Sequence, residues 1–255
     1  MNRKLLKRIL VTSAIAVLGV STSFAALVTE RDQSVDTAPS VGMYRFQVPT
    51  ELQGVYNSAG VANLTTSMEK EPNILSMNVA HVKGNPSESY VVEIYKDLAA
   101  IETHRKSDQY QAFVNEVGSK LTNRKMYDVQ SVLLFEKKDA LSIVNDGKAV
   151  VTLTEFNVDS NDIDTVQRQY QLDIERAVRD DAGYKAGYVL RERNAKNHWY
   201  VIQIYSDQEA LTKHLNSPGY RFMMSQIQGS LQNVTTKVLD GDILVNHGGQ
   251  AFVRP

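Results

Sequence analysis

One segment of this chain occurs twice. Residues 71–114 and 181–224 align without a gap, at a constant offset of 110 positions. Nine of the 25 positions from 90 to 114 are identical to their counterparts, and several of the others keep their chemical character, such as Val92/Ile202 and Ile101/Leu211. A repeat of this length indicates two copies of one small domain rather than a single large fold. Each copy must therefore build its own small set of helices and strands.

The first 25 residues have the composition of an export signal. Four basic residues precede an apolar run of 12 residues from Ile9 to Val20, which is too short to span a bilayer as a helix. The small residues Ser23 and Ala25 suit a cleavage site. We therefore expect a signal peptide at 1–25, a mature chain from Ala26, and a periplasmic or secreted protein. An uncleaved membrane anchor is the alternative.

The composition of the remaining chain limits its partners. It has no cysteine, which excludes disulfides, a thiol nucleophile and thiolate metal ligands. Loss of the signal removes four of the 28 Lys and Arg residues and leaves 24 against 29 Asp and Glu. This negative balance argues against nucleic acid or an anionic membrane surface as partner. No later run reaches 18 apolar residues, so no stable membrane insertion is expected.

Hydrophobic periodicity predicts the same element order in both copies. Alternating apolar residues predict strands, and apolar residues spaced three and four apart predict helices. In the first copy the expected strands are 43–48, 74–82, 89–96 and 127–135, with helices at about 50–69 and after the capping residues Asp97 and Ser107. In the second copy the expected strands are 153–158, 184–193, 199–206 and 237–245, with helices from about 163 and after Asp207 and Ser217.

This order is that of the ferredoxin-like βαββαβ unit, an α+β fold with helices on one face of its sheet. The strand around Val92 is nevertheless apolar on both faces, so the sheet needs a second layer. We expect the two tandem units to pair into an α+β barrel within one chain. The expected divisions are a flexible leader at 26–42, domain one at 43–136, a linker at 137–151, domain two at 152–246, and a tail at 247–255.

Several residues of the first copy form a family-like pattern. They are Glu71-Pro72-Asn73, Glu93-Ile94-Tyr95, Asp97, Ala100, His104, Ser107 and Tyr110. With them the chain resembles the antibiotic biosynthesis monooxygenase (ABM) domain, a dimeric α+β barrel, over 43–136 and less closely over 152–245. The resemblance implies the fold more firmly than a reaction. Members include oxygenases of quinols and polyketide aromatics that use O2 without metal or flavin, isomerase-like proteins, and haem-degrading enzymes.

The haem-degrading members differ from this chain at two positions. They place a Trp where this chain has His104, and their axial His lies ten positions later. Here the later position is Val114, and the second copy has His214 and Met224. Without an axial nitrogen the iron would have no protein ligand. The resemblance therefore implies an activity that needs no cofactor rather than haem degradation.

The resemblance points to His104, which the second copy repeats as His214. Imidazole titrates near neutrality, so it can accept a proton from a phenol or quinol and prepare the ring for attack by O2. A structural role is the alternative. A His at the end of a short helix can donate to free carbonyls and suits the negative helix end.

Glu93 is the second catalytic candidate. A carboxylate on a strand that is buried on both faces requires a partner, and Glu93 can pair with His104 and orient it. The second copy has Gln203 there, which cannot ionise, so catalysis is predicted in the first copy. A hydrogen bond to backbone or to a tyrosine is the alternative role.

Four tyrosines are candidates for an aromatic-binding pocket, although residues at this spacing more often form core: Tyr95, Tyr110, Tyr205 and Tyr220. The remaining histidines show no ligand spacing, so no metal site is predicted. Two functions are therefore expected as alternatives. One is a cofactor-independent monooxygenase of a quinol or other small aromatic. The other is a non-catalytic barrel that binds a small hydrophobic molecule or serves as a scaffold. A homo-oligomer is compatible with both.

Overall fold

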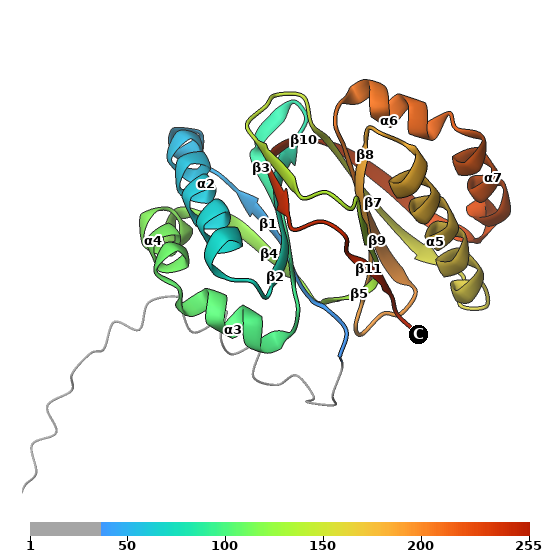
Figure 1. The fold of residues 1–255 in the computed structure, drawn as a ribbon, viewed down its shortest axis with the longest axis horizontal. Coiled ribbons are helices and arrows are strands. Elements are labelled where there is room, and N and C mark those ends of the chain that lie inside the picture. Colours follow the sequence, from blue (N-terminus) through green and yellow to red (C-terminus); the bar gives the residue numbers. More distant parts are fainter. Residues whose placement is uncertain (1–36) are drawn as a thin grey trace, which may run out of the picture. The chain divides into compact units, whose positions relative to one another are not determined.

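The computed structural model describes residues 37–255 of the 255-residue chain (Figure 1). The expected signal peptide, its cleavage site and the leader up to residue 36 lie outside the described residues. Within 37–255, no helix is both long enough and apolar enough to cross a membrane.

The two repeats have the same order of elements, except that the first ends in two strands and the second in one long strand, and this order confirms the tandem ferredoxin-like arrangement. The first contains β1 (Ser40–Gln47), α2 (Gln53–Lys70), β2 (Ile74–Val82), β3 (Asn85–Tyr95), α3 (Leu98–Lys106), α4 (Asp108–Glu116), β4 (Thr122–Tyr127) and β5 (Val129–Glu136). The second contains β7 (Val150–Val158), α5 (Ile163–Asp180), β8 (Tyr184–Glu192), β9 (His198–Tyr205), α6 (Gln208–Leu215), α7 (Pro218–Ile227) and β10 (Leu231–Asn246).

Side-chain caps fix the starts of the short helices, as the sequence predicts. The Asp97 carboxylate accepts a hydrogen bond from the Ala100 amide at 2.9 Å, and Asp207 caps α6 in the same way. Ser107 and Ser217 cap α4 and α7 through their hydroxyls. Each cap satisfies an amide that the first helical turn leaves without a partner. The Asp97 and Asp207 caps therefore fix the first turns of α3 and α6, the helices that carry His104 and His214.

The helix at 53–70 forms in spite of its two glycines. It has 18 residues, the same number as its counterpart α5. A Cβ at Gly60 would lie 3.3 Å from the Ile243 side chain of β10. The glycine therefore allows α2 to approach the sheet closely, and this packing outweighs the low helix propensity of glycine.

The two sheets share their last strands and form one antiparallel sheet. β10 pairs with β7 of its own repeat along its first half and with β2 of the first repeat along its second half. Reciprocally, β4 pairs with β1, whereas β5 pairs with β8 of the second repeat. The sequence predicted a single strand at 127–135 that closes the first unit. Two strands stand there because the chain leaves one sheet and joins the other near Asp128.

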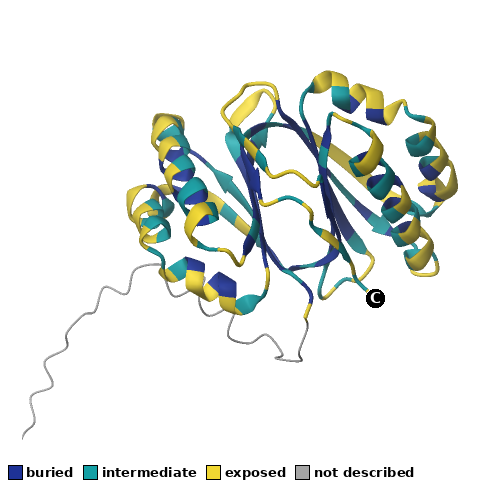
Figure 2. Cartoon of the chain, viewed as in Figure 1, coloured by how far each residue is buried: buried dark blue, intermediate teal, exposed yellow. Residues whose placement is uncertain are grey.

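Strands β5, β8 and β9 are buried at most positions and therefore on both faces, as expected for a barrel, whereas β4, β6 and the first half of β10 are largely exposed (Figure 2). Residues that point inward from both repeats form one apolar core, including Val92, Ile94, Ile202 and Ile204. The alternate residues of β3, such as Tyr95, pack against the helices instead. Helices α2, α3 and α4 cover the outer face of the first sheet, and α5, α6 and α7 that of the second (Figure 1).

The segments expected as linker and tail each contain a short strand. β6 (Leu141–Val144) pairs with β10, and β11 (Ala251–Val253) pairs with β5. Gly248 has a φ of +73°, and a Cβ there would lie 2.6 Å from the Asp139 carbonyl carbon. This position therefore requires glycine, because the tail crosses the linker in close contact.

Candidate functional site

His104 lies between α3 and the sheet, with 1% of its surface exposed. Its Nδ1 is 3.0 Å from Oε1 of Glu71, the residue that follows α2. Gln109 of α4 donates to the same Oε1 at 2.7 Å and to the Ser67 hydroxyl at 3.1 Å. A carboxylate accepts hydrogen bonds, so in the neutral imidazole this contact places the proton on Nδ1 and leaves the lone pair on Nε2.

The Nε2 atom of His104 differs from Nδ1 in its surroundings. It is buried and has no hydrogen-bond partner among residues 37–255. The ring of Tyr110 stands edge-on to the imidazole at 5.0 Å, and the Tyr95 ring lies at 5.8 Å. Buried polar atoms in proteins usually have a partner. This nitrogen therefore has a proton-accepting capacity that no described residue uses.

Glu93 comes close to His104 but does not orient it. The Glu93 carboxylate is 8% exposed and accepts a hydrogen bond from the Tyr95 hydroxyl at 2.9 Å. Burial raises the pKa of Glu93, and the nearby His104 and Tyr95 oppose this rise. The predicted orienting contact is made by Glu71 instead. A sequence signal for Glu71 exists, because the second repeat keeps an acid there, Asp181.

Tyr44 and Arg105 complete the site, and sequence reasoning missed both. In the register of β1 and β3, Gly42 stands opposite Glu93. A Cβ at Gly42 would lie 2.8 Å from the Tyr44 hydroxyl, so the tyrosine folds back across this glycine. The Arg105 guanidinium hydrogen-bonds the Tyr44 hydroxyl. Burial raises the pKa of Tyr44, the Glu93 charge raises it further, and Arg105 lowers it.

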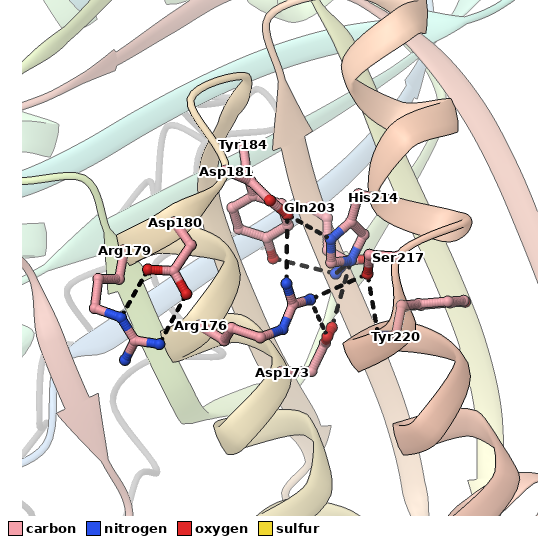
Figure 3. Close-up of polar contacts among 10 residues, drawn as sticks. All are labelled: Asp173, Arg176, Arg179, Asp180, Asp181, Tyr184, Gln203, His214, Ser217 and Tyr220. Carbon is pink, nitrogen blue, oxygen red and sulfur yellow. Dashed lines mark hydrogen bonds and ion pairs between the residues drawn. The ribbon is translucent and has the colours of Figure 1, made fainter.

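The second repeat surrounds its histidine with ionic partners (Figure 3). His214 is 1% exposed, with Nδ1 at 3.4 Å from Asp181 Oδ2 and Nε2 at 3.4 Å from Asp173 Oδ2. The Gln203 amide donates to the Tyr184 hydroxyl at 3.1 Å. Tyr205 and Tyr220 pack their rings on His214 at 5.7 and 5.2 Å. Nδ1 thus faces a carboxylate, and Nε2 has Asp173 beside it and the Gln203 amide nitrogen at 3.5 Å, so both ring nitrogens have polar neighbours.

Arg176 holds the two carboxylates of this cluster together. It donates to Asp173 Oδ1 at 2.7 Å and to the Ser217 hydroxyl at 3.2 Å, and its guanidinium lies 3.8 Å from Asp181. A Cβ at Gly219 would overlap the guanidinium, so the glycine makes room for the arginine. Within residues 37–255, no group of three or more His, Cys, Asp or Glu side chains is placed to hold a metal ion.

A further difference between the repeats concerns the strand that follows each long helix. Tyr184 and Gly187 of β8 stand where β2 has Ile74 and Met77. A Cβ at Gly187 would overlap the Tyr184 hydroxyl, so this glycine makes room for a ring that packs on His214 at 4.9 Å. The second repeat therefore fills with its own side chains the space beside its histidine.

Comparison with known proteins gives a family match in both repeats. The model of the family described as antibiotic biosynthesis monooxygenase matches residues 41–116 and again residues 149–225. None of the curated proteins is similar enough in sequence to match this chain.

Solved structures share the fold over most of the chain. A candidate monooxygenase from Lactobacillus acidophilus NCFM has a TM-score of 0.78 and 18% identity, covering 84% of this chain and 99% of its own. A second candidate monooxygenase, from Fusobacterium nucleatum, has a TM-score of 0.76 and 18% identity, covering 86% of this chain and 100% of its own. An anthrone oxidase-like protein has a TM-score of 0.52 and 11% identity, over 87% and 98%. At these identities the likeness shows the fold alone.

Proposed function

Because this chain belongs to the antibiotic biosynthesis monooxygenase family, we propose that it is a cofactor-independent monooxygenase of quinols or similar small aromatics. The proposed active site is in the first repeat. The observation that carries the proposal is the buried Nε2 of His104, which has no partner among residues 37–255 and lies beside two tyrosine rings. The equivalent nitrogen of the second repeat faces Asp173.

The first step is a proton transfer. A phenolic hydroxyl of the quinol gives its proton to His104 Nε2, and the electron pair of the O–H bond stays on the phenolate oxygen. Glu71 holds Nδ1 and balances the positive charge that forms on the ring. The electron-rich phenolate then reduces O2. One oxygen atom is added to the ring and the other leaves as water, so a quinol and O2 give a hydroxyquinone and water.

The remaining residues position the substrate in this proposal. Tyr110 and Tyr95 flank the imidazole and provide ring surfaces against which an aromatic can stack. Burial raises the pKa of Glu93, which favours its neutral form, and the carboxyl group fixes the Tyr95 hydroxyl at 2.9 Å. Glu93 is therefore a positioning residue for the pocket wall.

A non-catalytic barrel that binds a hydrophobic molecule, or serves as a scaffold, is the second candidate. The close packing of the Tyr95 and Tyr110 rings on His104 favours it, because these rings also act as core. Oxygen uptake by purified, metal-free protein with a panel of quinols separates the two functions. Uptake that requires the quinol and is lost on heat denaturation supports the monooxygenase. Binding of a quinol without any uptake would support the second candidate.

We also propose that the protein is exported to the periplasm or outside the cell. The support is the basic start, the 12-residue apolar run and the small residues at 23 and 25. Sequencing of the extracytoplasmic protein should then begin at Ala26. A chain in that fraction that still begins at Met1 would contradict cleavage.

A further inference from the structure

Arg105 is a charged group of the first repeat that the proton transfer above does not use. It follows His104 on α3, and 17% of its side chain is exposed. One end of the guanidinium hydrogen-bonds the Tyr44 hydroxyl. Its Nη1 is buried and makes no hydrogen bond within residues 37–255, with Glu102 Oε1 at 3.6 Å as the nearby carboxylate. Arg105 therefore has donor capacity left beside the proposed active site.

The second repeat has neither this arginine nor the tyrosine that it contacts. Leu215, which is 40% exposed, stands in the place of Arg105, and Thr154 stands in the place of Tyr44. The arginine and its tyrosine are thus found only in the repeat whose histidine keeps a free Nε2. A purely structural arginine at a helix end would not need to accompany that nitrogen.

The charge of Arg105 acts on the same groups that surround His104. It favours the ionised forms of Tyr44 and Tyr110, and so lowers their pKa values against the rise caused by burial. It also opposes the rise in the pKa of Glu93 that burial causes. Glu102 is 48% exposed, so water screens its attraction for the guanidinium. The site therefore presents a positive charge to any oxygen that becomes negative within it.

We propose that Arg105 holds the ionised oxygen of the substrate, so that the first repeat selects phenols and binds them as phenolates. The inference rests on the proposed function and names the form in which its substrate is held. The phenol proton moves to His104 Nε2, the electron pair stays on oxygen, and a guanidinium N–H donates to that oxygen. A charge-assisted hydrogen bond of this kind is stronger than a neutral one, and arginine keeps its charge throughout.

4-Nitrophenol tests this directly, because its phenolate absorbs visible light and the probe is not a quinol. The full-length mature protein is titrated with the probe at a pH below the pKa of the free phenol. We expect the phenolate band to appear on binding, with an ionisation constant at least about tenfold above that of the free probe. Arg105→Leu, which introduces the residue of the second repeat, should abolish this shift.

Leu215→Arg is the matched control and should leave the shift as in the wild-type protein. If Arg105→Leu does not fold, Arg105→Gln removes the charge while keeping a polar side chain and should give the same loss. A bound probe that stays a neutral phenol, or an undiminished shift in the Arg105 variant, would overturn the inference. A phenolate shift without O2 uptake for any quinol would instead overturn the proposed oxygenase and leave the role of Arg105 standing.

Discussion

The two repeats share a backbone but differ in how they satisfy one buried histidine. In the first, His104 bonds a carboxylate through Nδ1 and keeps Nε2 free of partners among the described residues. In the second, His214 lies between two carboxylates, and Arg176 joins both of them. A histidine present in both repeats is therefore insufficient to identify a base. The groups around its second nitrogen determine whether the histidine can accept a proton.

The differences between the repeats occur as matched pairs of residues. In the first repeat, Gln109 of α4 donates to the Glu71 carboxylate. In the second, Arg176 of α5 pairs with the equivalent Asp181, and Gly219 leaves room for the arginine. The buried acid also changes element, from Glu93 on the sheet to Asp173 on the helix. Each repeat thus has its own consistent set of contacts. A single residue copied from one repeat into the other should therefore disturb the contacts of the repeat that receives it.

The largest expected effect is on the stability of the second repeat. Arg176→Leu removes the arginine partner of Asp173, which is 1% exposed and keeps only His214 nearby. Breaking a buried ion pair by removing one member typically costs about 3–5 kcal/mol. We expect a loss toward the lower end of this range, because 26% of the Arg176 side chain is exposed. Urea unfolding measures it, and quinol turnover per folded molecule should stay unchanged. A fall in quinol turnover per folded molecule would instead place catalysis in the second repeat.

A slightly smaller effect is expected on the pH dependence of stability. Its source is Glu136 at the end of β5, where the second repeat has Asn246. Burial raises the pKa of Glu136 to about 7, and the Tyr188 hydroxyl donates to it at 2.7 Å. The unfolded chain loses this proton near pH 4.5, so unfolding releases a proton between pH 4.5 and 7. Stability should therefore fall by about 3 kcal/mol as the pH rises through this window.

Glu136→Gln tests that linkage, since glutamine cannot ionise. Its free energy of unfolding should lose this decline between pH 4.5 and 7, while Asn246→Gln, at the equivalent position, should keep it. A wild-type pH profile in the Glu136 variant would show that the carboxyl is not the source.

Next is the catalytic comparison. A general base typically contributes 10²–10⁴-fold, so His104→Gln should lower quinol turnover at least about a hundredfold. His214→Gln should change it much less, because the second histidine holds no free nitrogen. Both variants are first compared by thermal midpoint, since each removes a buried side chain. Equal, small losses of turnover from the two substitutions would favour the scaffold.

The smallest effect is expected from Glu71→Gln. Glutamine keeps a hydrogen bond to His104 Nδ1 but cannot balance the imidazolium charge that forms during proton transfer. We expect about a tenfold loss in kcat, with the pH profile of kcat displaced toward lower pH, because without the carboxylate the imidazolium loses its proton at a lower pH. Asp181→Asn is the matched change in the second repeat. A loss confined to stability, with kcat and its pH profile unchanged, would make Glu71 purely structural.

Periodicity predicted the architecture because each long element repeats its apolar spacing over many residues. The stripe from Ile163 to Val178 and the two-faced strands allowed a barrel to be predicted before any contact was known. β6 and β11 contain four and three residues, too few for such a pattern to be visible. The exchange of β5 into the other sheet depends on a register that sequence spacing does not encode.

The site was only partly predictable. His104, Glu93, Tyr95 and Tyr110 are brought together as expected. The orienting role of Glu71 was not predicted, because it lies 33 positions before His104 and on a different element. Tyr44 and Arg105 share no local pattern with them. The second repeat has Thr154 and Leu215 at their positions, but the repeats differ at too many positions for this difference to single them out.

The central claim is that His104 and His214 differ at Nε2. Nitrogen-15 NMR of the imidazole rings at neutral pH tests this directly, because nitrogen shifts distinguish a free lone pair from a protonated nitrogen. The chain has five histidines, and the His104→Gln and His214→Gln variants assign the two signals. We predict that His104 shows a protonated Nδ1 and a free lone pair on Nε2, whereas both nitrogens of His214 are hydrogen-bonded. The same pattern for both rings would contradict the account.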